Sequence, residues 1–191
     1  MKYSLGFTAG ALLHKEAMAY IAAIDSFEDY LAKKQMPSYL CVPTNSETSK
    51  KRLKSELDKR LLLLNVPYLS YLANAEAQEQ KIILLLSICK CYPIISEFLI
   101  EVVYPKWKRF DNDLSTYDFT YFLSERLQDD EVDCISDRTR YKLSQVAIKM
   151  LKEVGIVDDG AIKQVIPSDE LSALLQENAD GWFLNCLLLA V

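Results

Sequence analysis

Residues 75–92 limit the possible folds more than any other part of the chain, because they predict a helix that is apolar on almost every side. Between Ile82 and Ile88 the only polar residue is Ser87. A helix of this kind is buried, so other helices must surround it. The run is far shorter than the ~20 residues that a membrane-spanning helix needs, and so is the final apolar run, 182–191. We therefore expect the centre of a helical bundle and no membrane partner.

Apolar residues at helical spacing predict the surrounding helices. These are expected at 8–24, 26–31, 46–64, 93–103, 115–127 and 136–154, with short helical material before Leu72. The low content of Gly (5) and Pro (6) argues against an all-β fold. The fold class is therefore all-α, mostly a helical bundle. Asp, Asn and Ser cluster near 111–115, which suggests an N-terminal bundle, 1–112, and a C-terminal part, 113–191, although the two could pack as one unit.

The residue types that usually carry chemistry are scarce. The single histidine, His14, lies in an Ala- and Leu-rich helix, and the five cysteines form no CxxC pair. We therefore expect buried, reduced cysteines and neither a metal site nor a cofactor. No phosphate-binding or zinc-protease motif is present, and the acidic run 129–133 lacks the spacing of a calcium loop. The chain is expected to be a cytoplasmic binding protein rather than an enzyme.

The helix predicted at 136–154 has the clearest functional pattern. Ser136 or Asp137 can cap its start, and Gly155 lies just past its end. One side is apolar: Leu143, Val146, Ala147, Met150, Leu151 and Val154. The opposite side carries Arg138, Lys142, Gln145, Lys149 and Lys152. At 100° per residue these five lie within about 40° of a single line. Such a stripe is suited to phosphate contacts, but it is also typical of any solvated amphipathic helix.

A β-hairpin is predicted directly after this helix. Asp158-Asp159-Gly160 separates Ile156–Val157 from the segment Ala161–Ile166, and Asp-Gly between two apolar segments is a good hairpin signal. A basic helix followed by a hairpin is the pattern of a winged helix-turn-helix, whose recognition helix enters the major groove. The expected DNA-contact residues are Arg138, Arg140, Lys142, Gln145, Lys149, Lys152 and, on the wing, Lys163.

Two other basic segments are weaker candidates. Lys50, Lys51, Arg52, Lys54, Lys59 and Arg60 are offset by Glu47, Glu56 and Asp58, which favours a solvated face. Lys106–Arg109 mixes cations with Trp107, a combination that can hold nucleic acid, but Trp107 is more simply explained as a core residue. The net charge of −5 excludes a surface that is basic all over, but not a local basic face.

Several motifs resemble the BrxA family of bacterial BREX (bacteriophage exclusion) systems. They are YSLGFTAGALL at 3–13, CYPIISEF at 91–98, EVV at 101–103, Thr139-Arg140, and LKEVGI at 151–156. The resemblance implies an all-helical fold similar to that of the antitermination factor NusB. It also implies a nucleic-acid-binding accessory role beside other BREX proteins, and it assigns no catalytic residue.

Two roles follow from the residues and the resemblance together. The first is a non-enzymatic accessory protein that binds double-stranded DNA in an antiviral defence complex, with RNA left open as a ligand. The second is a scaffold subunit that binds other BREX proteins through its acidic surface or its apolar C-terminus, without touching nucleic acid.

Overall fold

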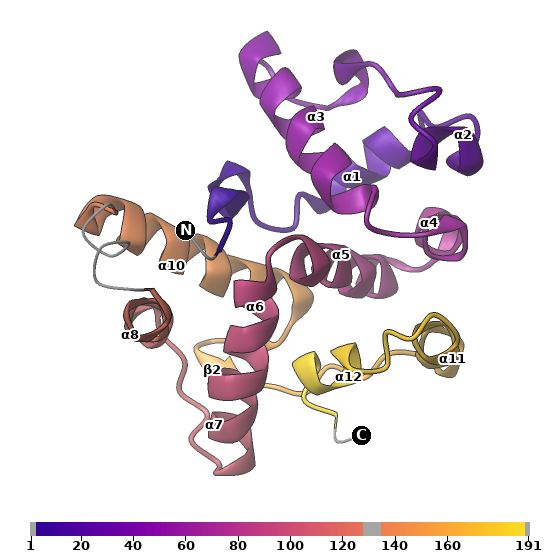
Figure 1. Ribbon diagram of the computed structural model, residues 1–191. Helices are drawn as coiled ribbons and strands as arrows, with labels where there is room; N and C mark the ends of the chain where they lie inside the picture. Colours follow the sequence, from indigo (N-terminus) through magenta and orange to yellow (C-terminus); the bar gives the residue numbers. More distant parts are fainter. Residues whose placement is uncertain (1–2, 128–134, 190–191) are drawn as a thin grey trace. The chain divides into compact units, whose positions relative to one another are not determined.

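The computed structural model describes residues 3–127 and 135–189, and these are mostly helical (Figure 1). They form two compact units, one of residues 12–91 and one that joins the N-terminal 11 residues to the chain from Tyr92 onward. This partition differs from the predicted division at 112/113, which stays a prediction. The acidic run 129–133 and Cys134 lie outside the described residues.

The 12–91 unit is built around the helix that the sequence predicted to be buried. Its elements are α1 (His14–Ile21), α2 (Phe27–Leu31), the 3-10 turn η2 (Tyr39–Cys41), α3 (Glu47–Leu61), α4 (Val66–Asn74) and α5 (Ala77–Cys91). Every residue of α5 from Ile82 to Cys89 is buried, Ser87 included, and α1, α3 and α4 all pack against this helix. The central-helix prediction is therefore confirmed.

The start of the first predicted helix was wrong. Residues Gly6–Ala9 form a separate 3-10 turn, η1, and α1 begins only at His14. The cause is local, because the backbone at Gly10 is extended (φ 173°) and Leu13 adopts a left-handed conformation (φ 58°). A continuous helix over 8–24 cannot pass through these two residues.

The second unit contains the remaining helices. They are α6 (Pro93–Phe98), the π-helical turn η3 (Leu99–Val103), α7 (Tyr104–Lys108), α8 (Thr116–Arg126), α10 (Asp137–Val154), α11 (Asp169–Glu177) and α12 (Phe183–Cys186). The helix that starts at Pro93 thus continues beyond its predicted end, through η3 into α7. Among the described residues of the C-terminal run, 182–189, the helix covers Phe183–Cys186, and Leu187 and Leu188 are buried as well.

Aromatic side chains form the core of this unit. The Phe98 and Phe119 rings meet edge to face, with centroids 4.9 Å apart, and Phe7 from η1 makes edge contacts with both Tyr92 and Phe119. Edge-to-face pairs of this kind add to the stabilisation that burial alone gives. They link α6 and α8 with the N-terminal segment.

The predicted hairpin is present and short. Strand β1 (Val157–Asp158) pairs antiparallel with β2 (Ala161–Ile162). Asp159 (φ 50°) and Gly160 (φ 85°) both have the positive φ that a tight type I′ turn requires. An antiparallel bridge joins Asp113 to Ala161 on the other side of β2, so the segment before α8 extends this small sheet by one edge.

Within the described residues, no single helix is long and apolar enough to cross a membrane. Helix α5 and the helical segment 93–108 reach that length and hydropathy only together, as a bent pair.

Candidate nucleic-acid interface

Helix α10 begins and ends where its local signals predict. The Ser136 hydroxyl accepts a hydrogen bond from the Thr139 amide (3.3 Å), and Gly155 closes the helix in a left-handed conformation (φ 93°). The helix packs on α8, η1 and β1, and α8 and α10 are close neighbours in Figure 1. The residues buried in these contacts are Leu143, Ser144, Ala147, Ile148, Met150, Leu151 and Val154. The predicted orientation of the helix is therefore confirmed, except that Val146, placed on the apolar side, is only half-buried.

The opposite side of α10 is exposed and carries the predicted stripe. We call it the cationic face; it consists of Arg138, Lys142, Gln145, Lys149 and Lys152, all exposed. Only Lys149 forms an ion pair with a described residue, Glu153, at 3.6 Å. Arg138, Lys142 and Lys152 have no such pair among residues 3–127 and 135–189, so their charges face solvent. This geometry permits contact with a row of phosphates, and it leaves Gln145 between the cations.

Arg140 does not belong to the cationic face. It lies two residues after Arg138, hence about 160° around the helix. Its Nη2 is 2.5 Å from the Asp137 carboxylate, and only a quarter of its side chain is exposed. Arg140 therefore lies on the side of α10 that meets α8, and it is poorly placed to act with the other predicted contacts.

Lys163, directly after β2, forms an ion pair with Asp158 of β1. Its Nζ lies 2.5 Å from the Asp158 carboxylate, and this contact raises the pKa of Lys163 and lowers that of Asp158. With Asp159 in the turn, two carboxylates accompany one ammonium group. The hairpin is consequently a weaker anion site than the cationic face of α10.

Two basic residues of α3, Lys54 and Arg60, form ion pairs inside their own unit. Arg60 is buried and its Nε donates to Glu56 at 2.8 Å, while Lys54 pairs with Asp58 at 2.6 Å. Asp58 also accepts hydrogen bonds from the Tyr20 and Tyr30 hydroxyls, and burial, aided by this carboxylate, raises the pKa of both phenols. A cavity of about 650 Å³ beside α3 retains some positive character, since Lys33, Lys51 and Lys59 help to line it.

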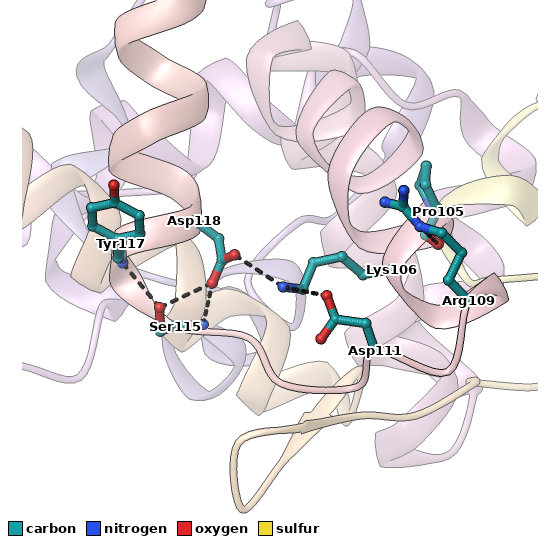
Figure 2. A network of polar contacts seen from close by, with 7 residues as sticks. All are labelled: Pro105, Lys106, Arg109, Asp111, Ser115, Tyr117 and Asp118. Carbon is teal, nitrogen blue, oxygen red and sulfur yellow. Dashed lines mark hydrogen bonds and ion pairs between the residues drawn. The ribbon is translucent and has the colours of Figure 1, made fainter.

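The Lys106–Arg109 segment forms a structural network (Figure 2). Lys106 lies 3.0 Å from Asp111 and 3.2 Å from Asp118, and Asp118 accepts hydrogen bonds from the Ser115 backbone and hydroxyl. Partial burial raises the pKa of Asp118, but the bonds from Ser115 and Lys106 outweigh it and hold that pKa below its usual value. The network ties the start of α8 to the end of α7. Trp107 is half-buried and stacks on Tyr104.

Three exposed tyrosines near the cationic face were not singled out in the sequence. They are Tyr117 and Tyr121 on α8 and Tyr141 on α10, and we call them the tyrosine cluster. The signal that could have revealed them is weak. Tyr117 and Tyr121 are four residues apart, and Tyr141 precedes Lys142, but the sequence alone does not show that α8 lies beside α10.

Comparisons with known proteins agree on family and fold. The BrxA family model matches residues 1–179. A curated relative, the BREX protein BrxA from Bacillus cereus (strain H3081.97), is 31% identical over 167 residues, which cover 85% of this chain and 84% of the relative. A crystal structure of an uncharacterized protein from Magnetospirillum magneticum has a TM-score of 0.73 at 18% identity, covers 98% of each chain, and supports the fold alone. The chain belongs to the BrxA family.

Proposed function

We propose that this chain is a non-enzymatic accessory protein of a BREX phage-defence complex that binds double-stranded DNA through α10. The observation that carries the proposal is the exposed cationic face, on which Arg138, Lys142 and Lys152 have no ion pair with a described residue. Cations in this arrangement bind DNA by displacing the counterions around its phosphates. Gln145, between them, is of the residue type that makes paired hydrogen bonds to adenine in the major groove.

The order of elements around α10 supports this proposal. A helical segment (α6 to α7), the bridging strand near Asp113, helix α8, helix α10 and a hairpin follow one another. This is the order of a winged helix-turn-helix, in which the last helix is the one that reads DNA. One feature departs from that pattern, because residues 127–136 separate α8 from α10 where a helix-turn-helix has a turn of about 3–4 residues.

The hairpin has a smaller part in the proposed contact than the sequence suggested. Lys163 is paired with Asp158, so binding would have to break that pair before the ammonium could reach a phosphate. The four cations of α10 are therefore expected to provide most of the affinity.

Fluorescence anisotropy with labelled duplex DNA and matched RNA, at two salt concentrations, tests the proposal. Four phosphate contacts predict that log K falls with log salt with a slope of roughly −3 to −4. Doubling the salt concentration should thus weaken binding by about tenfold. Tighter binding to RNA than to DNA would redirect the proposal to RNA, and no binding to either at low salt would contradict it.

A second candidate function is a scaffold that binds other BREX proteins. Phe110, between α7 and α8, favours it, since its side chain is 89% exposed, and Ile166 after the hairpin is also exposed. Exposed apolar side chains are common at protein contacts, although single ones are ordinary. Co-purification with the other BREX proteins in the presence of a nuclease, compared between wild type and Phe110→Ser, would reveal this role.

A further inference from the structure

The tyrosine cluster leaves much of its aromatic surface exposed, outside the core of its unit. Tyr117 is 73% exposed, and Tyr121 and Tyr141 are more than half exposed. The Tyr117 and Tyr121 rings stack with their centroids 6.4 Å apart and their planes inclined by 25°. In Figure 2 the Tyr117 ring stands apart from the Lys106 network, which engages only its backbone amide through Ser115. Besides the faces that Tyr117 and Tyr121 turn toward each other, these rings leave aromatic surface that a ligand can reach.

A cavity of about 390 Å³ lies among the three rings. Its walls are Tyr117, Thr120, Tyr121, Ser124, Asp137, Arg140 and Tyr141. This volume is within the range of small-molecule sites and can receive a planar ring such as a nucleobase. Hydroxyl groups and the Arg140 guanidinium, held by Asp137, supply polar partners at the edges.

The cavity adjoins the cationic face of α10. Ser144 marks the side that meets α8, since its hydroxyl lies 2.6 Å from that of Thr120. At 100° per residue, Tyr141 falls between Ser144 and the line of Arg138 and Lys142, about 60° from each of Ser144 and Arg138. A strand that follows the cationic face therefore passes directly beside the tyrosine cluster.

We propose that the tyrosine cluster stacks an unpaired nucleobase from the nucleic acid that lies along α10. This inference rests on the proposed function and narrows its substrate to DNA with an unpaired base next to a duplex, such as a tail, fork or bulge. Bases within a duplex already stack on their neighbours and present only their edges. Tyrosine rings accept any base face, so the site recognises an unpaired state rather than a sequence.

The test compares three DNA ligands by anisotropy at one salt concentration: a blunt duplex, the same duplex with a short single-stranded tail, and the duplex with an abasic tail of equal length. The abasic tail keeps the phosphates and removes the bases. The wild-type protein should bind the tailed duplex about tenfold more tightly than the blunt one, because stacking a base on an aromatic ring typically gives a gain of this size. The abasic tail should lose most of that gain.

Substitutions in the tyrosine cluster test which residues provide the tighter binding to the tailed duplex. Tyr121→Ala and Tyr141→Ala should remove the preference for the tail while leaving affinity for the blunt duplex within about twofold, whereas Tyr121→Phe and Tyr141→Phe should retain it. Phe110→Ala, at another exposed aromatic residue of the same unit, is the matched control and should have no effect. Far-ultraviolet circular dichroism checks that each variant is folded.

The outcomes separate this inference from the proposed function. Equal affinity for all three ligands, or a preference that survives both alanine changes, overturns the nucleobase site and leaves duplex binding intact. Binding to the tailed duplex that depends on Tyr121 and Tyr141, without binding to the blunt duplex, supports the site and contradicts the duplex proposal. If the alanine changes instead release a protein partner and leave DNA binding unaltered, the cluster is a protein contact and the inference is wrong.

Discussion

Helices α3 and α10 are both rich in basic residues, yet they use their charges in opposite ways. In α3 the Arg60 side chain is buried against Glu56, and Lys54 is held by Asp58 beside two buried tyrosines. In α10 the cations of one face point into solvent, and most of them have no ion pair among the described residues. The positions of the carboxylates account for the difference.

In α3 four of the six basic residues have an acidic residue four positions away, whereas in α10 only Lys149 has one, Glu153. An acidic residue at i±4 can neutralise a cation within the helix, and a cation without one is free to contact an anionic partner. A basic segment is therefore better judged by where its acids lie than by how many lysines it holds.

The largest loss of stability is expected in α3, where the ion pair between Glu56 and Arg60 stabilises the fold. Glu56→Ala removes the carboxylate that pairs with the buried Arg60, and breaking a buried pair in this way typically costs about 3–5 kcal/mol. The free energy of unfolding of the full chain, measured by denaturant titration, should fall by about that amount while DNA affinity per folded molecule is unchanged. Replacing both residues, Glu56→Leu with Arg60→Met, should cost less than the single change. A loss below ~1 kcal/mol for Glu56→Ala would show that the pair is not structural.

A smaller loss of stability is expected at Asp118, whose charge stabilises the unit that contains α10. Asp118→Asn removes the charge that holds Lys106 and should lower the free energy of unfolding by about 1 kcal/mol at neutral pH. The pKa of Asp118 is depressed in the folded state, so its contribution is present above the unfolded pKa of about 3.9 and is lost as pH falls through the folded value. The gap between wild type and Asp118→Asn should therefore close in acid. A gap that does not narrow as the pH falls below about 3.9 would contradict this assignment.

The smallest effect, a change in DNA affinity, is expected at the hairpin. Lys163 is already paired with Asp158, so Lys163→Ala should change affinity for duplex DNA by less than about twofold and leave the salt slope nearly unaltered. A matched change on the cationic face, Lys142→Ala, should make the slope shallower by about one. If Lys163→Ala has the larger effect of the two, the hairpin rather than α10 makes the main contact.

Local signals in the sequence were sufficient for many elements. Ser46, Ser115 and Ser136 cap the helices that they were expected to start, and Asp159-Gly160 forms the turn of the hairpin. These features depend on residues within one turn of each other, and for that reason they can be read from the sequence. The exposed side of α10 was predictable too, since an apolar stripe fixes which side is buried.

Other features depend on contacts between distant segments, and the sequence did not reveal them. The tyrosine cluster forms only because the packing of α8 on α10 brings Tyr121 near Tyr141. The position of Arg140 off the cationic face, by contrast, follows from the helical angle alone and was missed although the sequence contains it. The buried Arg60 was assigned to a solvated face, although at 100° per residue it lies within about 20° of Leu53 on the apolar side, whereas the exposed Lys59 lies about 120° away. The grouping of the N-terminal segment with the chain after Tyr92 likewise arises from tertiary contacts such as Phe7 with Phe119.

The most direct test of this account compares equal charge reversals on the two helices. Lys142→Glu with Lys149→Glu on α10, and Lys50→Glu with Lys59→Glu on α3, each alter the net charge by the same amount at exposed or half-exposed residues. Affinity for duplex DNA at low salt should fall by about a hundredfold for the α10 pair and by less than about threefold for the α3 pair, with both variants folded. Equal losses for the two pairs would mean that net charge alone governs binding, and a larger loss for the α3 pair would move the interface away from α10.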